Sequence, residues 1–281
     1  MKNKKFNPNI FTTPTPLKSL LTQLPESKFL YPNLWREGEI ACLLGDQGIG
    51  KSVFAIQIAE RVARENPDMP VVYFDFKMSA ADFARRYSNA VSGKHFDFPD
   101  NLLRCELDYA AENFNDVANI ISVIEQQCKA LNARVLIVDS LTWINTIALK
   151  SGAALRFMTM LYLLARKLHL SVLVVADSSK DHSRLPYTIK SLRGYRRLAP
   201  FFDTIFAIGI STKGDKHRYI KQIKTGDRDM TLTDDHVAEF VIEQNDDAFV
   251  NFRFKAYTSQ SEVLPPKRQR RQAHDQIKKS A

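Results

Sequence analysis

Residues 45–52 read GDQGIGKS, and this stretch constrains the fold more than any other part of the chain. It matches the pattern G-x-x-x-x-G-K-[ST] at every fixed position, and it lies between an apolar run and a segment with helical periodicity. Glycines permit the backbone angles that turn successive N–H groups inward around a phosphate. The start of the following helix also favours negative charge. The sequence therefore predicts a strand, a phosphate-binding loop and a helix, in that order.

This loop is the predicted nucleotide site. We expect Lys51 to bridge the β- and γ-phosphates of ATP, and the Ser52 hydroxyl to be a ligand of Mg²⁺. The predicted nucleotide-contacting residues are Gly45, Asp46, Gln47, Gly48, Ile49, Gly50, Lys51, Ser52 and Val53. Asp139 follows the apolar run VLIV, at the carboxyl edge of a predicted strand, where α/β proteins bind ligands. Asp139 is therefore the second predicted Mg²⁺ ligand, acting through water.

Apolar runs alternate with amphipathic segments along the chain. Strands are predicted near residues 40–44, 70–76, 133–140, 171–178, 201–211 and 216–225, and helices near 52–65, 114–131 and 153–170. This alternation indicates an α/β fold, a RecA-like P-loop core with a mainly parallel sheet flanked by helices and antiparallel strands at one edge. We expect a flexible arm at residues 1–25, one ATP-binding domain at 26–258 and a basic disordered tail at 259–281.

The composition fits a chain of 281 residues with one sizeable core. Its apolar runs are far shorter than the roughly 20 residues of a membrane span, and residues 1–16 lack the apolar core of a signal peptide. We therefore expect a cytoplasmic protein with no membrane partner. Of the formal net charge of +9, +5 lies in residues 265–281 and +3 on Lys2, Lys4 and Lys5. Basic ends of this kind add salt-sensitive affinity for nucleic acid, or only solubility.

Six blocks of the sequence resemble the RecA-like ATPases, in the branch that holds DnaB-type replicative helicases, RadA and KaiC. They read GEIACLLGDQGIGKS, VVYFDFKMSAADFARRY, RVLIVDSLTW, SVLVVADSSK, LRGYRRLAPFFDTIFAIG and RYIKQIKT, and they occur in the family's order. The resemblance is closer still to single-domain AAA-type ATPases of plasmids and mobile elements. It implies a RecA-type core and assembly into rings or filaments. It also implies ATP bound between subunits, and nucleic acid contacted by loops that face the central channel.

Three positions depart from the family's pattern. Where members normally carry the glutamate that polarises the attacking water, this chain has Lys77, which cannot act as a general base beside a triphosphate. Where members often carry a His or Gln sensor of the γ-phosphate, the chain has Asp177. An arginine that reaches the neighbouring subunit's nucleotide is common after the last block. Here Lys224 precedes Gly226, and the nearest arginine is Arg228, which could act through a longer turn.

These departures leave several catalytic candidates, namely Lys77, Asp75 and Asp177. Asp75 becomes the base if the register is displaced by one or two residues, and we expect it to point to the opposite sheet face from Phe74 and Phe76. The opposite charge changes at Lys77 and Asp177 suggest instead an ion pair between them, in place of the water-activating pair. Hydrolysis is then predicted to be weak or absent, although ATP binding is retained.

A basic loop with interleaved tyrosines is predicted at residues 178–202, between two strands. In RecA-like rings the corresponding segment faces the channel, and cationic plus aromatic side chains suit single-stranded nucleic acid. The other interpretation is an intersubunit or lid loop whose arginines contact a neighbouring nucleotide. With two later positions, the nucleic-acid or intersubunit candidates are Lys180, Arg184, Lys190, Arg193, Arg196, Arg197, Lys224 and Arg228.

The sequence thus favours an ATP-binding RecA-like protein that acts on DNA, preferably single-stranded, as a homo-oligomer and in the manner of a helicase-like or replication and mobilisation ATPase. The alternative is a weakly or non-hydrolysing ATP-dependent DNA-binding regulator. A P-loop small-molecule kinase fits less well, because the basic loop has a RecA-like position. Trp35 and Trp143 are candidates to stack on adenine, although burial in the core suits Trp143 better.

Overall fold

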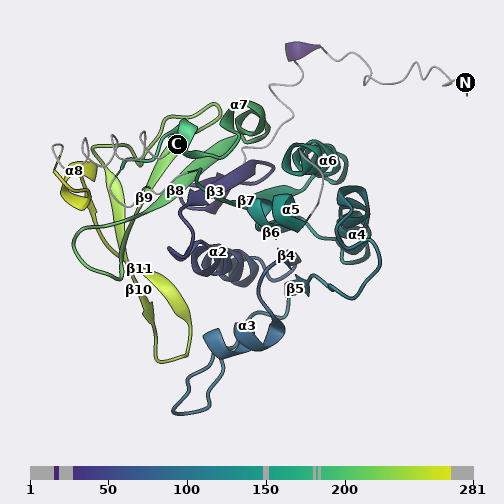
Figure 1. Cartoon of the computed structure of the whole chain (residues 1–281), viewed down its shortest axis with the longest axis horizontal. Coiled ribbons are helices and arrows are strands. Elements are labelled where there is room, and N and C mark those ends of the chain that lie inside the picture. The colour runs from purple at the N-terminus through teal and green to yellow at the C-terminus, as the bar shows by residue number, and fades with distance from the viewer. Residues whose placement is uncertain (1–15, 19–27, 148–151, 180–181, 183–184, 267–281) are drawn as a thin grey trace, which may run out of the picture.

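The computed structural model describes residues 16–18, 28–147, 152–179, 182 and 185–266. Within these residues, nine strands form one sheet in the order β11-β10-β9-β8-β3-β7-β6-β4-β5 (Figure 1). The parallel strands are β3 (Ile40–Gly45), β4 (Val71–Asp75), β5 (Leu102–Glu106), β6 (Val135–Asp139), β7 (Ser171–Asp177) and β8 (Thr204–Ile210). Strands β9 (His217–Lys224), β10 (Val237–Gln244) and β11 (Val250–Thr258) continue the sheet with antiparallel pairing. The predicted fold class is therefore confirmed.

Helices cover both faces of this sheet (Figure 1). Helix α2 (Lys51–Glu65) packs on one face, and α4 (Val117–Ala130), α5 (Leu141–Ile147) and α6 (Ala153–Leu168) pack on the other. Strand β3 shows how one strand serves both layers. Ile40, Cys42 and Leu44 belong to the core on the side of α4–α6, whereas Ala41 and Leu43 belong to the core around α2. Successive side chains of a strand point to opposite faces, which explains this division.

The smaller elements lie around these layers. They are β1 (Phe29–Tyr31), β2 (Trp35–Arg36), α3 (Ala80–Arg86), η1 (Ile189–Ser191), α7 (Tyr195–Leu198), η2 (Ala199–Phe201) and α8 (Gln260–Val263). No described helix is both long and apolar enough to cross a membrane.

An aromatic cluster fixes α2 against the sheet. Its centre is Phe54, which is fully buried. The rings of Tyr31, Phe206, Phe240 and Phe252 lie between 5.1 and 6.5 Å from the Phe54 ring centroid. Aromatic pairs at such separations stabilise a core beyond their buried area. Because Phe240 and Phe252 come from β10 and β11, the antiparallel part of the sheet helps to position the helix that follows the phosphate loop.

Two parts of the chain differ from the sequence-based expectation. Strands β5, β10 and β11 are absent from the prediction because charged residues interrupt their apolar patterns, as is common near sheet edges. The packed chain also continues past residue 258, since Val263 and Leu264 are buried and the Val263 carbonyl accepts the Thr212 N–H at 2.9 Å. Residues 1–15, 19–27 and 267–281 lie outside the described residues, so the arm and the remaining tail stay predictions.

Candidate functional site

The predicted phosphate loop leaves the carboxyl end of β3 and leads directly into α2. Gly48 and Gly50 adopt left-handed backbone angles, with φ of +80° and +105°. A side chain at Gly50 would also collide with the core, because its Cβ would lie 2.9 Å from Ile242 Cδ1 and 3.0 Å from Phe252 Cζ. The first turn of α2, which is described in full, holds no acidic residue. The loop and the start of this 15-residue helix therefore form a cradle that fits phosphate groups.

Lys51 is held at this cradle by three acceptors. Its Nζ donates to the Gly45 carbonyl at 3.1 Å and to the Asp46 carbonyl at 2.6 Å. The same atom forms an ion pair with Asp177 Oδ1 at 2.6 Å. The Lys51 side chain is 7% exposed and that of Asp177 is 26% exposed, so water screens this pair only in part. Since an ammonium group has three donors, these contacts account for all of them.

The ion pair predicted between Lys77 and Asp177 is therefore wrong for this structure. Asp177 is the register partner of Gly45 on the neighbouring strand, which places its carboxylate beside the phosphate loop. Lys77 follows β4, and β6 lies between β4 and β7 in the sheet. Adjacent strands are about 4.8 Å apart, so the backbone at Lys77 lies about 10 Å from β7. Lys51, in contrast, belongs to the loop and helix that follow β3, the strand next to β7.

The two predicted Mg²⁺ ligands lie near each other. The Asp139 carboxylate accepts the Tyr73 hydroxyl at 2.6 Å, and the Ser52 hydroxyl is close enough to influence its pKa. Burial raises the pKa of Asp139, and the nearby Asp75 adds to this, whereas Ser52 and Tyr73 act in the opposite direction. Hydroxyl and carboxylate oxygens suit Mg²⁺, whose charge offsets the cost of keeping a buried carboxylate ionised. This donor set fits the metal that a P-loop ATPase requires.

Asp139→Asn separates stability from metal binding. A raised pKa means that the folded chain binds more protons than the unfolded chain, so stability falls as pH rises from the ordinary value of 3.8 through the raised value. A neutral amide removes this cost. We expect the variant at pH 7 without Mg²⁺ to melt about 2 °C or more above the unmodified protein. We also expect its Mg²⁺-dependent affinity for nucleotide to be lost.

Thermal melting and titration with a fluorescent ATP analogue measure the two effects. The control is Asp108→Asn, which neutralises an exposed carboxylate outside the phosphate loop and should change neither quantity. A lower melting temperature for Asp139→Asn, or an unchanged response to Mg²⁺, would contradict the role assigned to this carboxylate.

A cleft of about 720 Å³ opens beside the phosphate loop. Lys77, Asp177 and Arg193 line it, together with Thr142 and Trp143 of α5. The Trp143 indole is partly buried and donates to the Tyr109 hydroxyl at 2.8 Å, so it borders the cleft rather than filling the core. The sequence did not predict Thr142 as a residue of the site, and it predicted Arg193 only as a cation of the basic loop. The signal for Thr142 is its position just after Asp139, where a polar turn meets the ligand edge of the sheet.

The other tryptophan is not available to a nucleotide. Trp35 is fully buried, and its indole donates to the Glu39 carbonyl at 3.1 Å. Of the two tryptophans, only Trp143 is therefore placed to contact a nucleotide in the cleft.

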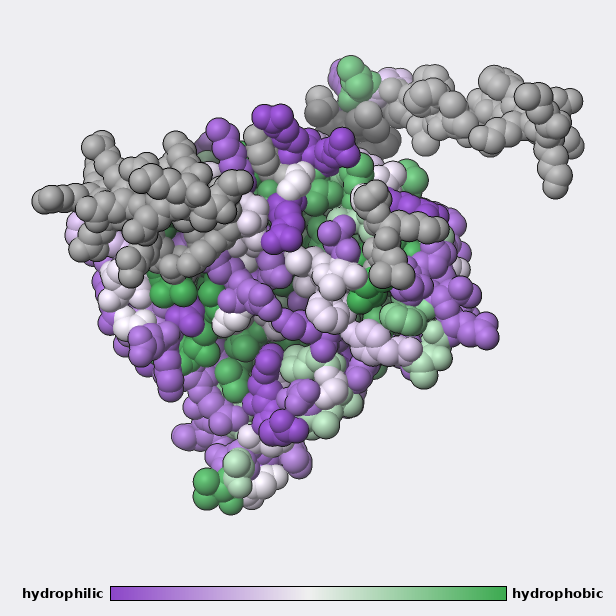
Figure 2. Space-filling view, viewed as in Figure 1, coloured by the Kyte–Doolittle hydropathy of each residue, from purple (hydrophilic) through white to green (hydrophobic). Residues whose placement is uncertain are grey.

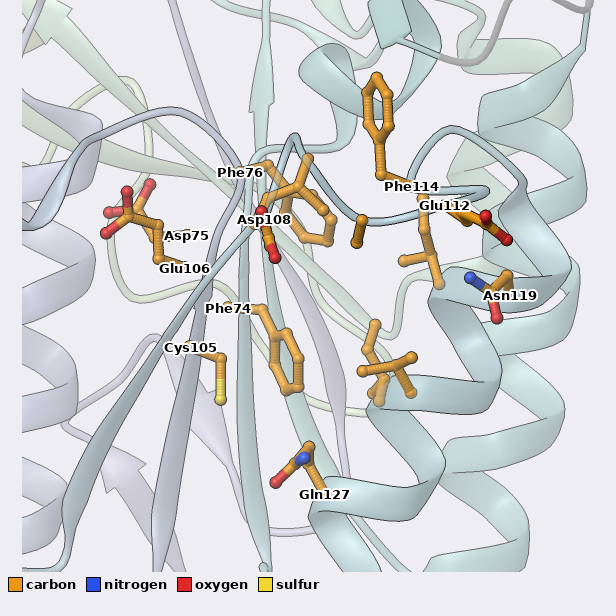
Figure 3. A pocket seen from close by; sticks show the side chains of 15 residues that line it. Phe74, Asp75, Phe76, Cys105, Glu106, Asp108, Glu112, Phe114, Asn119 and Gln127 are labelled. Atoms are coloured by element: carbon orange, nitrogen blue, oxygen red, sulfur yellow. The ribbon is translucent and has the colours of Figure 1, made fainter.

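Asp75 is not among the residues that line the nucleotide cleft, although it lies opposite Asp139 on the neighbouring strand. Figure 3 shows Asp75 and Glu106 pointing to one side of the sheet, and Phe74 and Phe76 pointing to the other, as strand alternation requires. The cavity in this view, of about 310 Å³, is bordered by β4, β5 and α4 and has no phosphate-loop residue in its lining.

The Asp75 carboxylate is buried and is held by an ion pair and two backbone N–H groups. It is 3% exposed, pairs with Arg104 at 2.9 Å and accepts the N–H groups of Lys77 at 3.0 Å and Met78 at 2.8 Å. These contacts fix the turn that presents Lys77, whose own side chain is exposed. To serve as a general base, Asp75 would have to leave a buried ion pair, which is costly.

The basic loop after β7 is tied to the phosphate loop through Asp46. The Asp46 carboxylate accepts the Ser178 hydroxyl and the His182 N–H at 2.6 Å, and the Asp46 N–H donates to the Tyr187 hydroxyl at 3.0 Å. The His182 ring stacks on Tyr187 at a centroid distance of 4.7 Å. Burial raises the pKa of Asp46, but hydrogen bonds from His182, Ser178 and Tyr187 outweigh it and leave the pKa lowered. An ionised residue of the phosphate loop thus holds the loop that carries the predicted cations.

The cations of this loop have different surroundings. Lys190, Arg193, Arg196 and Arg197 are exposed, and the surface over α7 is strongly hydrophilic (Figure 2). Arg193 differs from the others because it also lines the cleft. Lys180 and Arg184 lie outside the described residues. The role of these cations toward nucleic acid or a neighbouring subunit stays a prediction.

The two later candidates make contacts within their own chain. Lys224 donates its ammonium group to the carbonyls of Ala199 and Phe202. Arg228 is 10% exposed and pairs with Glu39 at 3.1 Å, near the amino end of β3. Both side chains thus have structural partners, and a contact with a neighbouring nucleotide would require Arg228 to leave its ion pair.

Comparisons with known proteins agree with this geometry. A family model described as an AAA domain matches residues 8–183, which is more than half of the chain. No curated protein sequence matches. A KaiC-like protein from the hyperthermophilic archaeon Pyrococcus horikoshii OT3 has a similar solved structure, with a TM-score of 0.58 and 15% identity over 79% of this chain and 91% of that one. At this identity, the similarity supports the RecA-like fold alone.

Proposed function

Since the chain belongs to the AAA domain family and has the fold of a RecA-like P-loop ATPase, we propose that it binds ATP and Mg²⁺ in the cleft and acts on single-stranded DNA as a cytoplasmic homo-oligomer. We propose further that it hydrolyses ATP slowly. The observation that carries this last part is the position of Lys77, an exposed cation that lines the cleft where the family has its water-activating glutamate.

Phosphate binding is supported by the residues of the loop itself. The left-handed glycines free the loop N–H groups to face phosphate oxygens, and the start of α2 adds its positive end. Lys51 supplies a positive charge to the phosphates once it exchanges its present acceptors for them. Ser52 and Asp139 would hold Mg²⁺, which neutralises phosphate charge when bound.

Slow hydrolysis is supported by the surroundings of the carboxylates near the cleft. Asp177 is paired with Lys51, and Asp75 is buried against Arg104. Lys77 offers a cation where a base is needed. A positioned general base contributes about 10²–10⁴-fold to a rate. An enzyme without one is expected to bind ATP tightly and turn it over slowly.

Lys77→Glu tests this assignment. It restores a carboxylate at the turn that Asp75 holds in place, so we expect the rate of phosphate release to rise by about 10²-fold or more. The control Lys129→Glu makes the same charge reversal on an exposed residue of α4 and should leave the rate unchanged. If Lys77→Glu hydrolyses ATP as slowly as the unmodified protein, this position does not limit the reaction.

The same assay, run with and without single-stranded DNA, separates two functions. ATP binding without DNA-stimulated turnover supports an ATP-dependent DNA-binding regulator. Strong stimulation supports the second candidate, a helicase-like motor in replication or mobilisation of a plasmid or similar element. The observation that favours a motor is the Asp46 contact between the phosphate loop and the basic loop, because it gives nucleotide and DNA a direct connection. The homo-oligomer rests on the resemblance to RecA-like ATPases, and light scattering measures it.

A further inference from the structure

The Lys51–Asp177 ion pair engages the Lys51 ammonium group, which is the group expected to contact the phosphates of a nucleotide. Lys51 can contact a phosphate only if it gives up at least one of its three acceptors. Two of these are backbone carbonyls of the loop, and the third is a carboxylate at 2.6 Å with a full negative charge. A phosphate that replaces Asp177 on Lys51 leaves this carboxylate beside an anion of the same sign, which is unfavourable.

A second cation lies next to Asp177. Ser178 and Leu192 form an isolated antiparallel bridge, so the adjoining residues Asp177 and Arg193 lie opposite each other across it. Side chains at opposite positions of such a pair are close enough to interact. Asp177 and Arg193 also line both the main cleft and an adjacent cavity of about 200 Å³. Arg193 is exposed and has no ion pair with any carboxylate of the described chain.

We propose that Asp177 determines how the site discriminates between nucleoside triphosphates and diphosphates. The Asp177 carboxylate competes with the terminal phosphate for the Lys51 ammonium group. When the phosphates bind Lys51, the Asp177 carboxylate pairs with Arg193 instead. The effect is larger for a triphosphate, because the additional phosphate brings more negative charge to the lysine that bridges the β- and γ-positions. This inference rests on the proposed function, nucleotide binding at the phosphate loop.

The exchange also reaches the basic loop. Arg193 belongs to that loop, and Asp46 holds the same loop through Ser178 and His182. A new ion pair between Asp177 and Arg193 adds a second contact between this loop and the end of β7, beside the Ser178–Leu192 bridge. Phosphate binding therefore alters the contacts of the segment that carries Lys190, Arg196 and Arg197.

A double-mutant cycle tests the proposal through equilibrium affinity rather than turnover. ATP and ADP are titrated with Mg²⁺ into the unmodified chain, Asp177→Asn, Arg193→Gln and the double variant, with displacement of a fluorescent nucleotide as the readout. We expect Asp177→Asn to tighten ATP binding by at least about tenfold, equivalent to about 1.4 kcal/mol, and ADP binding by a smaller factor. Arg193→Gln should weaken ATP binding severalfold alone but have no effect in the Asp177→Asn background.

Two controls make the cycle specific. Lys77→Gln removes another cation of the same cleft and should combine additively with Asp177→Asn, because β6 separates their strands. Asp108→Asn removes an exposed carboxylate elsewhere and should leave the ratio of ATP to ADP affinity unchanged.

An unchanged ratio of ATP to ADP affinity in Asp177→Asn overturns the proposal. So does a loss from Arg193→Gln that persists in the double variant, since it shows direct contact with the nucleotide. If circular dichroism shows that Asp177→Asn is unfolded, the test rests on the single variant Arg193→Gln. An ATP affinity of Arg193→Gln equal to that of the unmodified chain then overturns the proposal. If the unmodified chain binds neither ATP nor ADP, the proposed function itself fails, and this inference fails with it.

Discussion

Replacing Lys51 with alanine is expected to weaken ATP binding by about 10²-fold or more. The variant removes the side chain whose ammonium lies at the phosphate loop, and it leaves Asp177 without its partner at 2.6 Å. Truncating one member of a hydrogen-bonded charge pair costs about 2–5 kcal/mol, and each 1.4 kcal/mol is a factor of ten in affinity. The measurement is a titration of Mg²⁺ and ATP followed by the fluorescence of Trp143, which lines the same cleft.

Two comparisons make this result interpretable. Lys129→Ala removes an exposed lysine of α4 that pairs with Glu125 on the same helix, and it should bind ATP like the unmodified protein. Trp143→Phe identifies which part of the fluorescence change comes from the cleft, since Trp35 is fully buried. Unweakened ATP binding by Lys51→Ala, with a normal thermal melt, would place the nucleotide site somewhere other than the phosphate loop.

Arg104→Ala is expected to destabilise the fold by about 3–5 kcal/mol, because it leaves a buried carboxylate without its ion pair. Asp75 is 3% exposed, and Arg104 donates to it through two nitrogens, at 2.9 and 3.1 Å. The Arg104 guanidinium also lies 5.0 Å from the Phe83 ring centroid, so its removal loses packing as well as charge. Urea unfolding of the purified protein measures this change as a lower midpoint.

The matched control is Arg85→Ala. Arg85 pairs with Asp82 on the surface of α3 and is 76% exposed, so its loss should cost less than about 0.5 kcal/mol. The double variant Asp75→Asn with Arg104→Ala should recover part of the loss, because no charge is then left buried. If Arg104→Ala costs no more than Arg85→Ala, Asp75 is not held as the structure indicates, and its role as a catalytic base becomes open again.

The sequence predicted the parts of the site that depend on local pattern. Gly48 and Gly50 adopt left-handed backbone angles, and a glycine-rich motif between a strand and a helix predicts such angles. The proximity of Ser52 and Asp139 was also predictable, because the phosphate loop and Asp139 both follow the carboxyl ends of parallel strands, which share one edge of the sheet. The parallel strands were predictable for a similar reason, since β3, β4, β6 and β7 carry continuous apolar runs that both core layers bury.

The electrostatic partners were not predictable, because they depend on the order of strands in the sheet. The charges of Lys77 and Asp177 suggested a pair, but β7 lies beside β3, and β6 separates it from β4. Asp177 therefore meets Lys51. Arg193 joins the cleft because an isolated bridge folds its loop back onto the end of β7, which no local pattern encodes.

Arg228 is a second residue whose side-chain partner could not be predicted from the sequence. As a basic residue after a late strand, it suggested a contact with a neighbouring subunit. Its guanidinium instead pairs with Glu39, 189 positions earlier in the chain, and lies 5.1 Å from the Phe29 ring centroid. Sequence periodicity describes which face of an element is buried, but it does not describe which distant side chain will occupy that face.

The central claim is that the phosphate loop binds ATP while the described residues that line the cleft offer no free base to hydrolyse it. The most direct measurement is a single-turnover experiment, in which the unmodified protein in excess is mixed with Mg²⁺ and labelled ATP, and bound ATP and ADP are followed over time. We predict that ATP is bound and stays largely intact over a period in which a typical enzyme, at about 10 s⁻¹, would convert all of it. Conversion of the bound ATP at such a rate, without any change at Lys77, would contradict the claim.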